Sequence, residues 1–163
     1  MSGMSIRKVE MESVNKQLME QLSQVLTHSE PENFKDCLSW WQSWFSDKIP
    51  GEKLTIIAEE ENNIIGVVRF WKTPFCNNKW LIEGLEVIPT KREKGIGKSM
   101  VEEGIRILQI TTNEKIFSHI DNENIASINL HKGIGFNKIS NGSINSYGEF
   151  RGHVDEYFLE TLR

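Results

Sequence analysis

The sequence predicts an α/β (α+β) fold in which a mixed sheet carries helices on both faces. Two observations lead to this prediction. Apolar residues recur with the period of a strand or of a helix, in the order strand, two helices, three strands, then helix, strand, helix and two strands. A loop with one proline and two glycines joins the last of the three central strands to the next helix. Strands and helices in such an order form layers around a common core.

The first third of the chain predicts one strand and two helices. The strand spans Ile6 to Val9. Ser29 to Glu32 has the S-x-x-E form of a capping box, with a proline in the first turn, and predicts the start of the second helix. The apolar stripes of the two helices are Leu18, Met19, Leu22, Val25 and Leu26, and Phe34, Cys37, Leu38, Trp41, Trp44 and Phe45.

The rest of the chain predicts six strands and two helices. Asn62-Asn63 predicts a hairpin turn between the first two central strands. The expected strands are 54–59, 64–71, 80–88, 116–120, 136–139 and 154–159, and the expected helices are 97–110 and 125–133. The longer of these helices has an apolar face made of Met100, Val101, Gly104, Ile105 and Leu108.

Length and composition predict one domain over residues 1–163, because 163 residues can bury one core but not two comfortable ones. Hydrophobic residues make up 38% of the chain and charged residues 26%, as in ordinary globular proteins. No run approaches the roughly 20 apolar residues that span a bilayer, and the N-terminus lacks the apolar segment of a signal peptide. We therefore expect a cytoplasmic protein without a membrane partner.

Charge and ligand spacing argue against two further classes of function. The net charge of −4 does not suit non-specific nucleic-acid binding, which needs a basic surface. Cys37 and Cys76 form no CxxC pair, and the four histidines show no HExxH or similar spacing. We expect free thiols and no metal site.

The segment from Leu85 to Ser99 is the most informative part of the sequence. A strand ends at Pro89, glycines follow and an amphipathic helix begins, an arrangement that presents free N–H groups to a phosphate. A Walker A loop would need glycine where Arg92 stands, and the GxGxxG pattern would need glycine at Met100. The pattern [RQ]xxGx[GA] is satisfied by Arg92, Gly95 and Gly97.

This pattern resembles the acetyl-CoA loop of the GNAT superfamily of N-acetyltransferases. The segment V-x-P-x-x-R-x-x-G-I-G over 87–97 is similar to the strand-to-loop signature of that family. The segment N-x-x-S-x-x-L-H-x-x-x-G-F over 124–136 is similar to its second motif, except that His131 stands where a tyrosine is usual. The resemblance covers roughly residues 5–160. It implies a mostly antiparallel sheet with a splayed cleft for acyl-CoA between two strands.

The resemblance also implies where acetyl-CoA, the co-substrate, would bind. The pantetheine arm would pair with the backbone near Leu85 and Val87, since a splayed strand leaves backbone groups without partners. Asn124 would contact the pantetheine or the thioester. The pyrophosphate would take backbone N–H groups from Arg92, Glu93, Lys94, Gly95, Ile96, Gly97 and Lys98.

For catalysis the resemblance implies direct attack of a neutral amine on the thioester in a ternary complex. This reaction needs a base for the amine and a proton donor for the leaving thiolate. Glu83 stands four residues before the signature valine and is the expected base, with an ordered water as the alternative. Strand alternation predicts that Glu83 shares a face with Leu85 and Val87. His131 is the expected residue near the sulfur.

The acceptor is less constrained than the donor. A small-molecule or peptide amine is expected, and a homodimer is compatible with the sequence. Trp40 lies off the apolar stripe of its helix and is a candidate for the border of the acceptor site. Two alternatives stay open: a non-catalytic acyl-CoA-binding module with the same fold and, with less support, a P-loop nucleotide-binding protein.

Overall fold

A computed structural model describes residues 3–112 and 114–159 of the chain. Its strands are β1 (Met4–Lys8), β2 (Glu52–Glu60), β3 (Asn63–Thr73), β4 (Lys79–Val87), β5 (Ile116–Asp121), β6 (Asn137–Ser140), β7 (Ser143–Ile144), β8 (Phe150–Arg151) and β9 (Val154–Leu159). Its α-helices are α1 (Lys16–Leu26), α2 (Phe34–Trp44), α3 (Ile96–Thr111) and α4 (Ile125–Ile134), and short 3₁₀ turns cover Met11–Ser13, Pro31–Asn33 and Pro89–Lys91. The predicted elements are all present, and the short hairpin β7–β8 is an addition.

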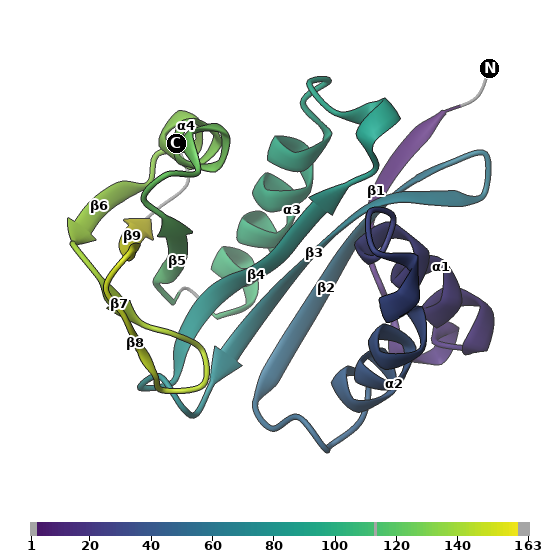
Figure 1. Cartoon of the computed structure of the whole chain (residues 1–163), viewed down its shortest axis with the longest axis horizontal. Helices are drawn as coiled ribbons and strands as arrows, with labels where there is room; N and C mark the ends of the chain where they lie inside the picture. Colours follow the sequence, from purple (N-terminus) through teal and green to yellow (C-terminus); the bar gives the residue numbers. More distant parts are fainter. Residues whose placement is uncertain (1–2, 113, 160–163) are drawn as a thin grey trace.

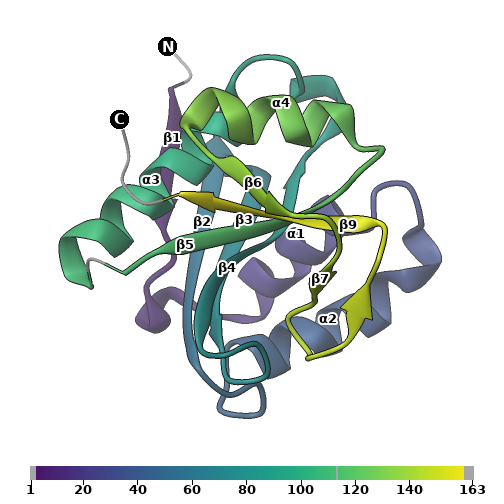
Figure 2. The ribbon, with the colours of Figure 1, turned by 90° about the vertical axis from the view of Figure 1, so that its left-hand side faces the viewer.

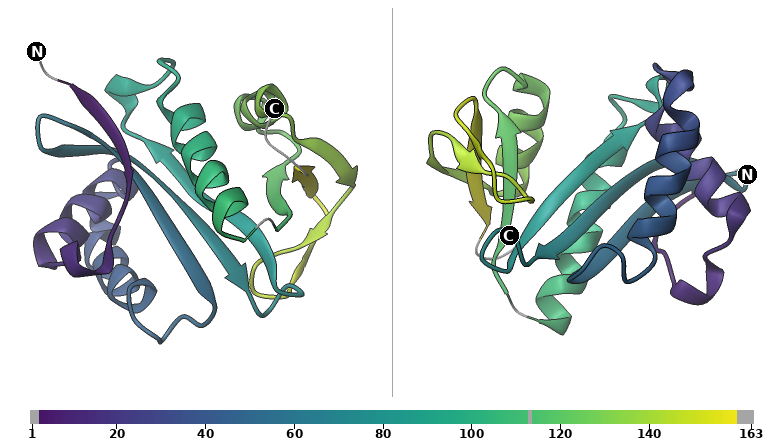
Figure 3. Two further views of the ribbon diagram at one scale, coloured as in Figure 1. Left: turned by 180° about the vertical axis from the view of Figure 1, so that it is seen from behind. Right: turned by 60° about the horizontal axis from the view of Figure 1, so that its bottom comes forward.

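The described residues form a seven-stranded sheet in the order β1-β2-β3-β4-β5-β9-β6 (Figure 1). Only β4 and β5 pair in parallel, and all other neighbours are antiparallel. Seen from behind, α3 lies in front of the sheet and α1 and α2 lie beyond it (Figure 3). The predicted mixed, mostly antiparallel sheet with helices on both faces is confirmed.

Each face of the sheet has its own apolar core. On one face, α3 packs Met100, Val101 and Ile105 against the centre of the sheet. On the other face, α1 and α2 pack Leu22, Trp41 and Trp44 against β2 and β3. Trp41 and Trp44 are almost fully buried, as their places on the apolar stripe predict.

Two local predictions need correction. The capping box at Ser29 does not form, because Pro31 opens a 3₁₀ turn whose N-cap residue is Glu30, without a side-chain cap, and α2 begins only at Phe34. The hairpin turn lies one residue earlier than predicted. Its two turn residues are Glu61 and Asn62, with φ of 54° and 66°, since Asn63 already pairs with Glu60.

Strands β4 and β5 pair over only three positions and then diverge. The pairs are Trp80 with Ile116, Leu81 with Phe117 and Ile82 with Ser118. Beyond these pairs, β4 continues to Val87 and β5 continues to Asp121, and the two strands no longer pair with each other. Their divergence forms the V that is visible between them (Figure 1). Beyond the V, β5, β9 and β6 run side by side, and α4 lies along them (Figure 2).

A β-bulge in β4 lies where the strands begin to diverge. The register with β3 shifts between Val67, which faces Glu86, and Arg69, which faces Glu83. Gly84, with φ of 58°, is in the left-handed region within the extra stretch of β4. The bulge reverses the alternation of side chains beyond Gly84.

Candidate functional site

A cleft of about 790 Å³ lies along the end of β4, beyond the point where β4 separates from β5. One wall is the end of β4, the second is the loop and first turn of α3, and the third is the start of α4. The lining residues are Leu85, Glu86, Val87, Pro89, Lys91, Arg92, Glu93, Gly95, Ile96, Gly97, Lys98, Asn124, Ala126, Ser127 and Leu130. All ten residues predicted to bind the cofactor, apart from Lys94, are among these.

The loop between β4 and α3 is shaped by two residues in the left-handed region, Glu93 with φ of 61° and Gly95 with φ of 79°. Gly95 is the N-cap of α3, and a Cβ at this position would meet no atom within 4 Å. Glycine is therefore favoured here by backbone conformation and not by close packing. The loop turns its backbone outward just before the helix begins.

The first turn of α3 leaves its N–H groups without intrahelical partners, and no side chain caps Gly95. These donors lie at the positive end of a helix of 16 residues, which favours an anion. Lys94 and Lys98 are exposed on either side of them. The residues present therefore suit the pyrophosphate of acetyl-CoA.

The side chain of Arg92 is held against the end of β4 and does not extend into the loop. Its Nε donates to the carbonyl oxygen of Val87 at 2.9 Å, and its Nη2 donates to Glu86 Oε1 at 2.5 Å. The same nitrogen lies 3.1 Å from Nε2 of His28 on the far side of β4. The side chain of Arg92 thus ties the loop to the end of β4.

The walls of the cleft are close together at Gly97. A Cβ at this position would lie 3.4 Å from Leu130 Cδ1 on α4 and 3.8 Å from Leu85 Cδ1 on β4. At the mouth, Asn124 caps α4 by accepting from the N–H of Ser127 at 3.1 Å. The cap fixes the amide of Asn124 beside the start of α4.

The prediction that Glu83 shares a face with Leu85 and Val87 is wrong. Leu85 and Val87 pack against the core on the α3 side, whereas Arg69, opposite Glu83, lies against the tryptophans of α2. The bulge at Gly84 accounts for the difference, because one extra residue reverses the alternation. Glu83 therefore faces the α2 side, opposite the loop that suits the pyrophosphate.

His131 is buried behind the wall of the cleft and does not line it. Its side chain lies between β5 and α4, with 2% of the residue exposed. Nδ1 donates to the carbonyl oxygen of Ser127 at 2.7 Å, so in the neutral ring Nε2 accepts from Ser118 Oγ at 2.9 Å. Burial lowers the pKa of His131, and the hydrogen bond to Ser127 opposes this shift.

Comparison with known proteins now identifies the family. A family model described as "Acetyltransferase (GNAT) family" matches residues 15–136, which is more than half of the chain. The chain belongs to the GNAT acetyltransferase family. It is thus an N-acetyltransferase-family enzyme, and the family uses acetyl-CoA. A search of curated proteins found no match.

Solved structures share the GNAT fold with this chain. The aminoglycoside 6'-acetyltransferase type Ii aligns with a TM-score of 0.71 at 16% identity, over 94% of each chain. A protein assigned to the GNAT family from Desulfovibrio desulfuricans gives 0.74 at 15%, over 97% of this chain and 99% of the other. An N-acetyltransferase from Campylobacter jejuni in complex with acetyl coenzyme A gives 0.66 at 16%, over 95% and 98%. At such identities the likeness establishes the fold.

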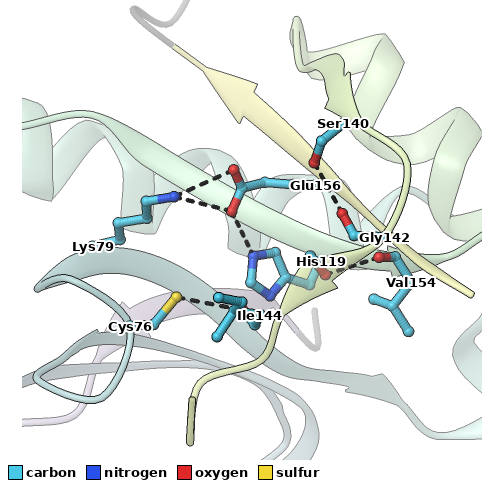
Figure 4. Close-up of polar contacts among 9 residues, drawn as sticks. Cys76, Lys79, His119, Ser140, Gly142, Ile144, Val154 and Glu156 are labelled. Carbon is cyan, nitrogen blue, oxygen red and sulfur yellow. Dashed lines mark hydrogen bonds and ion pairs between the residues drawn. The ribbon is translucent and has the colours of Figure 1, made fainter. Parts of the chain in front are cut away.

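On the α2 side of this GNAT sheet, the structure gathers polar residues that the sequence did not single out. Lys79 of β4, His119 of β5 and Glu156 of β9 form one cluster (Figure 4). Glu156 lies 2.9 Å from His119 Nε2 and 3.2 Å from Lys79 Nζ. Side chains alternate along β5, so His119 lies on the face of the strand that is opposite to the buried Ser118. Its pairing with Glu156 of β9 could not be predicted from the sequence of either strand alone.

Two further features bear on the chemistry of this GNAT enzyme. Among residues 3–112 and 114–159, no group of three or more His, Cys, Asp and Glu side chains could hold a metal ion. Over the same residues, no helix is both long and apolar enough to cross a membrane.

Proposed function

We propose that this GNAT enzyme transfers the acetyl group of acetyl-CoA to a primary amine of a small molecule or peptide, by direct attack in a ternary complex. The observation that carries the proposal is the cleft between the end of β4, the first turn of α3 and the start of α4, at one end of which lie the free N–H groups of α3. We further propose that residues 1–163 act as one domain.

Acetyl-CoA supplies an activated thioester. The residues proposed to hold it act mainly through the backbone. The N–H groups of residues 92–98 would take the pyrophosphate, and the unpaired backbone of β4 near Leu85 and Val87 would take the pantetheine arm. Asn124 lies across the cleft from these groups. The acceptor would then approach from the opposite face, where the bulge at Gly84 places Glu83.

Glu83 is the proposed base for the acceptor amine. Alkylamines are largely protonated at neutral pH, and only the neutral amine attacks a carbonyl carbon, so a carboxylate beside the amine serves both to attract the cation and to take its proton. Glu83 directly follows Ile82, the last β4 residue that pairs with β5, so it stands at the point where the cleft opens.

His131 is the proposed acid for the leaving thiolate, and its surroundings set a condition on this role. Because Nδ1 donates to Ser127, a proton for the sulfur would have to leave from Nε2, through the Ser118 hydroxyl. Ser118 pairs with Ile82 at the base of the V. The lowered pKa of His131 makes the required imidazolium scarce at neutral pH. The second candidate is a non-catalytic acyl-CoA-binding module, which would need no acid at His131.

The experiment that separates the candidates measures binding and turnover together. Calorimetry gives the affinity for acetyl-CoA, and release of free thiol from acetyl-CoA is followed with a panel of small amines and peptides. Amine-dependent thiol release supports the enzyme. Acetyl-CoA binding without release for any amine supports the non-catalytic module, and no binding of acetyl-CoA contradicts both.

A further inference from the structure

Arg69 lies on β3 directly opposite Glu83, on the face proposed for the acceptor. Its guanidinium carbon lies 4.2 Å from the ring centroid of Trp40 and 5.2 Å from that of Trp44. On its other side the guanidinium packs on the bulge, where a Cβ at Gly84 would overlap Nη2. The guanidinium thus contacts an aromatic ring and packs close to the backbone of the bulge, and both contacts restrict its movement.

This guanidinium is poorly satisfied by the protein. Its Nε is buried and has no hydrogen-bond partner in the structure. No carboxylate of the described residues lies within 4.0 Å of Arg69, although Glu83 and Tyr147 are near enough to interact electrostatically with it. Arg69 as a whole is half-buried, and arginines that lose water are normally paired, because desolvation of an unpaired charge is costly. The guanidinium therefore has no carboxylate of the described residues in direct contact, and its Nε has no acceptor among them.

The location of Arg69 connects it to the proposed reaction. Glu83 and Arg69 are cross-strand neighbours, whose Cβ atoms stand about 5 Å apart in an antiparallel pair. The guanidinium of Arg69 packs against Gly84. Gly84 is also the residue after which β4 forms a wall of the cleft. Tyr147, which interacts electrostatically with Arg69, is 55% exposed, and it stacks on Phe75, which is 49% exposed, with 6.2 Å between the ring centroids.

We propose that the acceptor is an amino acid or a closely related amine that carries a carboxylate, with the carboxylate bound to Arg69 and the amine beside Glu83. This inference rests on the proposed function. The planar fork of a guanidinium matches a carboxylate in bidentate geometry. Two bonds separate the amine from the carboxylate in an α-amino acid, which fits two charged side chains on neighbouring strands. An acceptor with cationic groups only would place one of them against Arg69.

The test compares matched acceptors at fixed acetyl-CoA. Each set holds a free amino acid, its carboxamide and the corresponding decarboxylated amine, together with a dipeptide and an aminoalkyl phosphate. We expect kcat/KM for the amino acid to exceed that for its carboxamide by about 100-fold, the usual scale for losing one partner of a buried charge pair. A dipeptide as good as the amino acid would identify a peptide as the source of the carboxylate.

Variants of Arg69 then assign the preference to this side chain. Arg69→Met should reduce the ratio of amino acid to carboxamide toward one, and Arg69→Lys, which keeps the charge without the fork, should give an intermediate ratio. Arg106→Met, on an exposed arginine paired with Glu103, is the matched control and should keep the ratio of the parent enzyme. Calorimetry with acetyl-CoA checks that each variant keeps its donor site.

The possible failures are distinct from one another. Equal or better turnover of carboxamides and plain amines by the parent enzyme would overturn the inference and leave the proposed function standing, and this result needs no variant to fold. A preference for the aminoalkyl phosphate would overturn the assignment to a carboxylate. A preference that survives in folded Arg69→Met would overturn the role of Arg69. Absence of thiol release with every acceptor would contradict the proposed function itself.

Discussion

Gly97→Val should weaken acetyl-CoA binding without unfolding the protein. The side chain at position 97 would enter the cleft between Leu130 and Leu85, where a Cβ alone already lies 3.4 Å and 3.8 Å from their methyl carbons. A Cβ fits at these distances, and the two further methyl groups of valine would crowd the narrow part of the cleft that the cofactor is proposed to occupy. Inserting such groups into a packed site typically costs about 1–3 kcal/mol, which corresponds to a loss of about 10- to 100-fold in affinity for acetyl-CoA.

Two neighbouring substitutions serve as controls for Gly97→Val. Gly97→Ala adds the Cβ at ordinary contact distance and replaces a helical glycine, so it should raise the free energy of unfolding by about 0.5–1 kcal/mol with little change in affinity. Gly95→Ala should instead lower the free energy of unfolding. Its Cβ meets nothing within 4 Å, but the residue has φ of 79°, so the cost of about 1–2 kcal/mol is in backbone strain.

The assay is isothermal calorimetry with acetyl-CoA beside thermal unfolding of each variant. At about 2–4 °C per kcal/mol for a chain of this length, Gly95→Ala should unfold at a lower temperature than the parent protein and Gly97→Ala at a higher one. Unchanged acetyl-CoA affinity in a folded Gly97→Val variant would refute the placement of the cofactor between β4, α3 and α4.

Three further predictions follow from the same geometry. Glu83→Gln should lower kcat by about 10²- to 10⁴-fold while acetyl-CoA affinity stays within a factor of a few; wild-type turnover at every pH would exclude Glu83 as the base. His131→Phe should lower kcat more than acetyl-CoA affinity, and His131→Tyr should restore much of it; equal loss in both would indicate packing alone. The pKa of His131 is lowered in the folded state, so the unfolded chain binds its proton first and stability should fall as pH drops below about 6.5, by at most about 1.4 kcal/mol per pH unit. Chemical denaturation between pH 7 and 5 measures this slope, which His131→Phe should reduce.

The sequence predicted the elements, and it predicted residues that the fold brings together in one cleft, because both depend on local patterns. The helix periods over 97–110 and the glycines at 95 and 97 act within one segment, and nine of the ten predicted cofactor residues line a single cleft. The hairpin and capping predictions were wrong because a different local structure formed in each of these two short segments. At 31 a proline stabilised a 3₁₀ turn in place of the expected helix start, and the β2–β3 turn closed one residue early.

The acceptor side could not be predicted in the same way, because it depends on pairing between distant strands. In the sequence, Arg69 is simply one polar residue in an apolar strand. Its surroundings become known only when β3 pairs with β4 and α2 packs on the same face of the sheet. The cluster of Lys79, His119 and Glu156 likewise draws on three strands that are far apart in sequence. His131 stands at the tyrosine position of its motif, and its burial behind Ser118 becomes known only when α4 packs on β5.

The bulge at Gly84 links these two halves of the site. Without the extra residue, simple alternation would turn Glu83 toward the same face as Leu85 and Val87. With it, Leu85 and Val87, which line the cofactor cleft, lie on the face of β4 opposite to Glu83, two and four positions away from it. The thioester at the opening of the V would then be reached from the side opposite the cofactor arm. Gly84 also leaves the space into which Arg69 packs, so the same local irregularity that separates donor from acceptor positions the proposed carboxylate-binding group.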